Sequence, residues 1–150
     1  MTDPLSRTAR FDLPYLFAGQ AQREVFVNEA LARIDTAMHP AIADSLAEPP
    51  PNPQEGDCYL IVAPAGGAWE GQEGALASFG AGAWQLQKPL AGMRIWDRPR
   101  AAWAHFDGAA WKTAEMPPAP EGGGTIDAEA RAAITQILDR LREVGIFSLP

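Results

Sequence analysis

The sequence is poor in the residues from which small proteins build disulfides and metal sites. Its 150 residues include one cysteine, Cys58, and two histidines, His39 and His105. One cysteine excludes a disulfide within the chain and cannot form a thiolate metal cage. Neither histidine has a second metal-ligating residue at a useful spacing. We therefore expect no bound metal and no cofactor, and a chain of this length can form a core without them.

Lysine and long apolar runs are also scarce. Lys88 and Lys112 are the two lysines, and the formal net charge at pH 7 is -7. A surface of this sign repels a phosphate backbone, so nucleic acid is not an expected partner. No run approaches the roughly 18 apolar residues of a membrane span, and the first ten residues lack the apolar segment of a signal peptide. We expect synthesis in the bacterial cytoplasm, no signal peptide and no membrane insertion.

Motifs of common catalytic sites are absent from the sequence. It contains no phosphate-binding loop, no dinucleotide-binding glycine fingerprint and no nucleophile elbow. Carboxylates in turns are usually solvated, and nothing singles out two of them as a pair for sugar hydrolysis. We expect no catalytic residues and a protein that is not an enzyme. An enzyme that degrades polysaccharide is the least favoured alternative.

Two segments near the ends of the chain have the periodicity of amphipathic helices. The first, residues 19–38, contains no proline and is rich in Ala, Gln, Glu and Arg, which favour helix. Its apolar residues recur at spacings of four, three and four: Val27, Leu31, Ile34 and Met38. This spacing predicts one apolar stripe along a helix that ends before Pro40.

The second helical segment follows a run of glycines. Thr125 is its expected N-terminal cap, and Gly145 is its expected C-terminal stop. Apolar residues at spacings of four, three, four and three define a seam: Ala130, Ile134, Ile137, Leu141 and Val144. This pattern predicts a coiled-coil-like oligomerisation helix, and isoleucine at adjacent seam positions favours three or more strands. Because roughly 18 residues is short for an independent coiled coil, we expect it to act with the first helix or with a partner protein.

Between the helices, short β-favouring runs alternate with glycine turns. The runs predict strands at residues 58–63, 75–79, 84–88, 93–97, 102–106 and 111–113. Two turns are alike, because an aromatic residue, a glycine-containing turn and a tryptophan recur from Phe79 to Trp84 and from Phe106 to Trp111. Each motif predicts a β-hairpin in which the two rings face each other.

Proline and glycine divide the chain into five expected parts. They are an N-terminal arm and helix (1–48), a Pro-rich connector (49–57), a β-hairpin module (58–115), a Pro/Gly linker (116–124) and the C-terminal oligomerisation helix (125–150). The expected fold class is α+β, with a small antiparallel Trp-rich β-hairpin module between two helices.

The five tryptophans all fall in the β-hairpin module. Exposed aromatic rings can stack on sugars, whereas buried rings build the core of a small sheet. The repeated motif accounts for Trp84 and Trp111 as core residues. Trp69 and Trp103 are therefore the candidates for an exposed carbohydrate-binding surface, with a place in the core as the alternative for both.

Part of the chain resembles a known family. The segment LPYLFAGQAQREVFVNEALARID (residues 13–35), the strand motif GDCYLIVA and the GAW and FDGAAW turns are similar to a domain of unknown function from alphaproteobacterial prophages and gene transfer agents. The similarity extends to about Lys112. It implies a virion protein of head spikes or tail fibres, which serves particle assembly and attachment to host surface polysaccharide, and it implies no catalytic residues. Because the chain stops at Pro150, we expect any large receptor-binding domain to belong to another chain.

These observations predict a structural component of a phage-like particle or gene transfer agent. We expect a homo-oligomer, specifically a trimer, that forms the base or adaptor of a head spike or tail fibre. Its expected partners are other virion proteins of the capsid, the tail or a distal fibre. The alternative is a carbohydrate-binding module that contacts host capsule polysaccharide.

Overall fold

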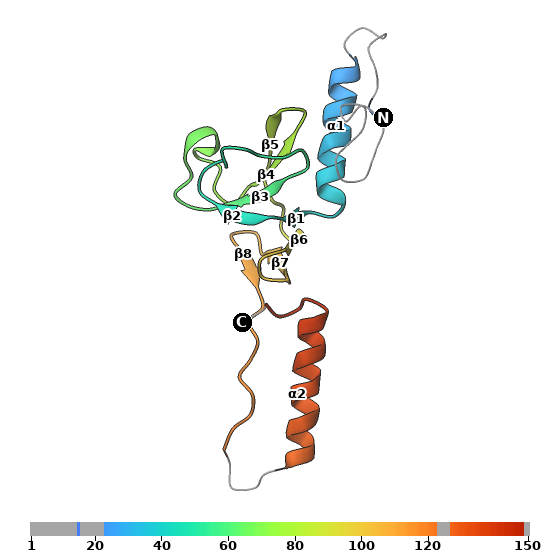
Figure 1. Ribbon diagram of the computed structural model, residues 1–150, viewed down its shortest axis with the longest axis vertical. Helices are drawn as coiled ribbons and strands as arrows, with labels where there is room; N and C mark the ends of the chain where they lie inside the picture. The colour runs from blue at the N-terminus through green and yellow to red at the C-terminus, as the bar shows by residue number, and fades with distance from the viewer. Residues whose placement is uncertain (1–14, 16–22, 123–126, 149–150) are drawn as a thin grey trace.

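The computed structural model describes Tyr15, residues 23–122 and residues 127–148. They form an α+β fold, as predicted, with helix α1 (Arg23–Met38) before the strands and helix α2 (Ala128–Glu143) after them. The strands are β1 (Ala41–Ile42), β2 (Asp44–Leu46), β3 (Cys58–Ile61), β4 (Leu76–Gly80), β5 (Ala83–Gln87), β6 (Arg94–Asp97), β7 (Ala102–Phe106) and β8 (Trp111–Thr113). Figure 1 shows the strands in the middle of an elongated molecule, with α1 beside them and α2 extending away at the other end.

The strands form two sheets of the same plan. Each sheet is an antiparallel meander of three consecutive strands, β3-β4-β5 or β6-β7-β8, with a short parallel strand beside its first strand. Both added strands, β1 and β2, come from residues 41–46. The Trp96 amide donates to the Pro40 carbonyl over 2.8 Å, and the Ala43 amide donates to the Cys58 carbonyl over 2.7 Å. This segment therefore joins the two sheets. No strand was predicted for these residues.

The two hairpins predicted from the repeated motif are present. Phe79 lies opposite Trp84 across β4 and β5, with ring centroids 5.0 Å apart. Phe106 lies opposite Trp111 across β7 and β8, with centroids 5.4 Å apart. Such aromatic pairs contribute about 0.5–1.5 kcal/mol beyond their buried area. The repeated motif therefore specifies the same hairpin twice.

The two central strands of the sheet β2-β3-β4-β5 contribute side chains to an apolar cluster on each face, because successive side chains of a strand point to opposite faces. Cys58 of β3 and Leu76 of β4 join residues of the other sheet, β1-β6-β7-β8, in one apolar cluster. Ile61 of β3 and Ala77 of β4 point into a second cluster around Trp69, which belongs to the 3-10 turn η2 (Gly67–Trp69). The core of the molecule thus has two layers, separated by this sheet.

Helix α1 turns its apolar stripe toward solvent. The exposed fractions are 40% for Val27, 49% for Ile34 and 59% for Met38, and Leu31, the fourth residue of the stripe, is half-buried, whereas Asp35 and Thr36 are buried. The predicted stripe therefore exists on a helix, but the sheets do not cover it. Residues 19–22, which the sequence analysis assigned to this helix, lie outside the described residues.

The linker lies alongside α2 (Figure 1). The Arg131 guanidinium donates to the carbonyl oxygens of Pro120, over 3.2 Å, and of Gly122. Near the other end of the helix, Arg142 donates to the sulfur of Met116. The described part of the predicted linker, residues 116–122, is thus held to the helix by two arginines, and residues 123–124 lie outside the described residues.

Candidate functional site

The predicted seam of α2 is largely uncovered. Exposed fractions are 43% for Ile134, 58% for Ile137 and 62% for Val144, while Leu141 is half-buried and Ala130 is exposed. None of the 16 residues of α2 is buried. A helix normally hides an apolar stripe against the body of its own protein. Here the stripe is available to another surface.

The two ends of α2 are fixed by local hydrogen bonds. At the start, an Asp127 carboxylate oxygen accepts from the Ala130 amide over 2.8 Å, so the cap is Asp127 and the cap predicted at Thr125 is wrong. Thr125 itself lies outside the described residues. At the end, Gly145 has a φ of 74° and the Ile146 amide donates to the Leu141 carbonyl over 2.9 Å, which is a Schellman motif. The stop predicted at Gly145 is confirmed.

Gly145 also joins α2 to the sheet β1-β6-β7-β8. Its carbonyl accepts from the Trp103 amide over 2.8 Å, and a β-carbon at this position would overlap the ring of Trp96. Trp96 and Trp103 are register partners whose ring centroids lie 5.2 Å apart. Immediately beyond, Phe147 bridges to Ala114. The C-terminal end of α2 is therefore anchored on the β-module, while the rest of the helix extends from it.

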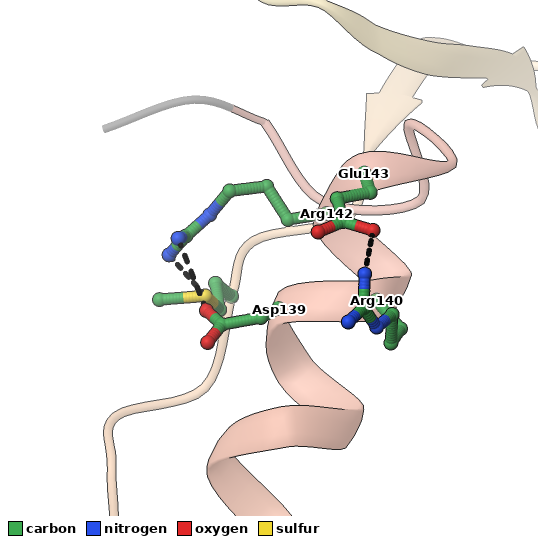
Figure 2. A network of polar contacts seen from close by, with 5 residues as sticks. Asp139, Arg140, Arg142 and Glu143 are labelled. Carbon is green, nitrogen blue, oxygen red and sulfur yellow. Dashed lines mark hydrogen bonds and ion pairs between the residues drawn. The ribbon is translucent and has the colours of Figure 1, made fainter.

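Ion pairs lie on the surface of α2 beside the seam. Figure 2 shows Arg140 paired with Glu143 and Arg142 directed toward Asp139, and the two N–O distances are 2.5 Å and 3.4 Å. Exposed pairs of this kind contribute about 0.3–0.5 kcal/mol each. Their main effect is to keep charge of both signs at the flanks of the stripe, as in helices that pair with other helices.

The two candidate sugar-binding tryptophans have different surroundings. Trp69 is fully buried, at 0% exposure, and its ring centroid lies 5.0 Å from that of Trp84. The exposure expected for Trp69 is therefore wrong, because η2 folds the ring into the second core cluster. Trp103 is half-buried, between Trp96 and His39. Carbohydrate binding at Trp103 stays a prediction.

Two tyrosines have raised pKa values. Burial is the main cause for Tyr15, and the negative charges of Asp35 and Glu55 raise its pKa further. Burial also raises the pKa of Tyr59, and so does Asp57, which accepts a hydrogen bond from the Tyr59 hydroxyl over 3.2 Å. Both shifts stabilise the neutral phenol, the form in which the Tyr59 hydroxyl donates to Asp57.

The described residues contain no group of three or more His, Cys, Asp or Glu side chains that could hold a metal ion. Within the same part of the chain, no helix is long and apolar enough to cross a membrane.

The sequence profile of one protein family matches residues 27–112, which is more than half of the chain. The family is described as a protein of unknown function, DUF2793. The chain belongs to this family. The match begins within α1 and ends within β8, so the family region comprises both sheets, and α2 lies beyond it. No curated protein and no solved structure matches the chain.

Proposed function

We propose that this member of the DUF2793 family is a non-enzymatic structural component of a phage-like particle or gene transfer agent. In this role it forms a homo-oligomer, expected to be a trimer, at the base of a head spike or tail fibre. The observation that supports the proposal is the exposed seam on α2, a helix that is anchored at one end and projects from the β-module (Figure 1).

The size of the seam indicates that α2 does not assemble the protein alone. Complete burial of an apolar side chain of this size contributes about 1.5–3 kcal/mol, so covering the exposed parts of Ile134, Ile137 and Val144 gives roughly 2–5 kcal/mol per protomer. A trimer would bury three such seams, roughly 6–15 kcal/mol in total, whereas each of its two association steps costs about 4–15 kcal/mol in lost rotational and translational freedom. A second apolar surface is therefore needed.

Helix α1 supplies that second surface, because Val27, Ile34 and Met38 are also exposed. Both helices run roughly along the long axis of the molecule in Figure 1. A rotation axis parallel to this direction can bring the α1 stripes together at one end of an assembly and the α2 seams together at the other. Isoleucine at adjacent seam positions favours three protomers over two. The assembled protein would then connect other virion proteins of the capsid or tail with a distal fibre.

A carbohydrate-binding module that contacts host capsule polysaccharide is the second candidate function. Trp103 favours it, because its ring is partly accessible, whereas the buried Trp69 offers no face to a sugar. Glycan binding that disappears in Trp103→Ala, with the fold intact by circular dichroism, would support this second function.

Particle incorporation tests the first proposal. The chain would be expressed in a strain that produces phage-like particles, and the purified particles would be examined by quantitative mass spectrometry. The proposal predicts that the chain co-purifies with particles and that Ile137→Asp lowers its incorporation. Gln136→Asp adds the same charge at the adjacent off-seam position and is the matched control. A chain that stays entirely in the cytosolic fraction would contradict a virion role.

A further inference from the structure

A groove of mixed polar and apolar lining lies between α1 and the hairpin β4-β5, away from the seam of α2 and from Trp103. It has a volume of about 220 Å³. Helix α1 contributes Arg33 and Thr36, and the hairpin and its end contribute Ser78, Gln85, Leu86, Gln87 and Lys88. Of these seven lining residues, four carry neutral hydroxyls or amides, two are cations and one is apolar.

The hairpin register explains why these side chains share one face. Along β5, Gln85 and Gln87 point to one side of the sheet, while Trp84 and Leu86 point to the other. Ser78 is the register partner of Gln85, so it lies on the same face. Thr36 lies on the buried side of α1, directed away from the exposed apolar stripe. The polar residues of the hairpin are therefore those that the sheet turns toward the helix.

Two groups in the groove have unused hydrogen-bonding capacity. The side-chain carbonyl oxygen of Gln85 is buried and has no hydrogen-bond partner among the described residues. An unpaired buried acceptor is unfavourable, and rotation about the terminal torsion of glutamine can turn the amide toward the groove. Lys88 is exposed and forms no ion pair within the described part of the chain, whereas Arg33 pairs with Glu29 over 2.6 Å.

We propose that this groove binds an acidic sugar, a pyranose that carries a carboxylate. An unpaired acceptor at Gln85 requires a donor, which a sugar hydroxyl supplies. The Lys88 ammonium is exposed at the groove and can form a charge-assisted hydrogen bond with the carboxylate. The Ser78 hydroxyl donates to the Gln85 main-chain carbonyl over 3.4 Å and keeps lone pairs that can accept from a ring hydroxyl, and the Gln87 amide can donate or accept. None of the described residues that line the groove is aromatic, so these residues offer a nucleotide base no stacking surface.

Polar contacts without ring stacking predict weak binding of one sugar unit. A repeating acidic polysaccharide could engage several grooves of an assembly at once, which would raise the apparent affinity without any new contact. That gain depends on the proposed oligomer. Binding of a single sugar to the groove does not depend on it, so the two proposals can fail separately.

A titration followed by NMR tests the groove directly. The full chain, labelled with ¹⁵N, would be titrated with glucuronate, galacturonate, glucose and inorganic phosphate at equal ionic strength. The proposal predicts saturable shifts of the Gln85 and Gln87 side-chain amides with at least one uronate, and binding at least about tenfold weaker with glucose. Unchanged chemical shifts of these amides with both uronates would overturn the proposal. Phosphate binding as tight as uronate binding would reduce the groove to a general anion site and would equally overturn it.

Variants locate the binding to the named side chains. Lys88→Gln should weaken uronate binding about tenfold or more, because it removes a charge-assisted contact. Lys112→Gln removes the other lysine of the chain, on β8, and should leave the binding unchanged. Gln85→Leu keeps the size of the side chain, removes the unpaired acceptor and should abolish the shift at Gln87. Equal effects of the two lysine substitutions would show that the site is not the groove.

Discussion

Trp69 gives the sharpest test of the packing of the β-module. Its ring is fully buried in the second core cluster, yet its indole nitrogen has no hydrogen-bond partner among the described residues. Trp111 is less buried, but its indole nitrogen donates to the Gly74 carbonyl over 2.8 Å. Substitutions at these two positions therefore separate the contribution of ring volume to the free energy of unfolding from the contribution of a hydrogen bond.

The expected magnitudes follow from these surroundings. Trp69→Ala removes a buried ring and should lower the free energy of unfolding by about 3–5 kcal/mol. Trp69→Phe keeps most of the packing and removes an unpaired buried N–H, which offsets about 1–3 kcal/mol of the loss. Trp111→Phe loses a hydrogen bond worth about 0.5–1.5 kcal/mol in addition to ring volume. We expect Trp69→Phe to be less destabilising than Trp111→Phe, although Trp69 is the more buried residue.

Urea unfolding followed by far-UV circular dichroism, at one fixed protein concentration, measures these differences. The fixed concentration matters because any oligomer contributes to the apparent stability. A loss below about 1 kcal/mol for Trp69→Ala would show that the ring is not a core residue. A greater loss for Trp69→Phe than for Trp111→Phe would show that the indole nitrogen of Trp69 has a partner after all.

Three further outcomes follow from the described contacts. Gly145→Ala should lower the melting temperature more than Gly71→Ala, because both positions have positive φ, of 74° and 72°, but a β-carbon overlaps a tryptophan ring only at Gly145. Glu55→Ala should make the two amides of the β4-β5 turn exchange hydrogen roughly fivefold to tenfold faster, because its carboxylate accepts from them over 2.9 and 3.0 Å. Hydrogen bonds from the backbone amides of Ala110 and Ala109 lower the pKa of the Asp107 carboxyl from its ordinary value of 3.8. The stability that these hydrogen bonds contribute is present above pH 3.8 and is lost as pH falls through the lowered pKa. The difference in urea midpoint between the native chain and Asp107→Ala should therefore shrink between pH 5 and pH 2.

Local sequence signals predicted the elements that local interactions define. The hairpins were predictable because an aromatic residue, a glycine turn and a tryptophan at fixed offsets specify both the turn and the cross-strand pair, from Phe79 to Trp84 and again at the second hairpin. The end of α2 was predictable because helices commonly end at a glycine in the left-handed backbone conformation. Gly145 adopts this conformation.

Elements that depend on distant partners were not predictable in the same way. Strands β1 and β2 have two and three residues, too few to show alternation, and they form only by pairing with β6 and β3 far along the chain. Trp69 lies outside the repeated hairpin motif and was therefore a candidate for exposure, but η2 places its ring in the second core cluster, with Ala77 of β4. The apolar stripe of α1 was predicted on a helix, but the sequence alone could not show that Val27, Ile34 and Met38 of this stripe are exposed while Asp35 and Thr36 are buried.

The mass of the full chain in solution tests the central claim most directly. Sedimentation equilibrium over a range of micromolar concentrations would be compared for the native chain, Ile137→Asp and the control Gln136→Asp. We expect three times the chain mass of 16.1 kDa for the native chain and the control, with a shift toward 16.1 kDa for Ile137→Asp. A native chain that sediments as a 16.1 kDa monomer at every concentration, with its helix content intact, would contradict the proposed oligomer.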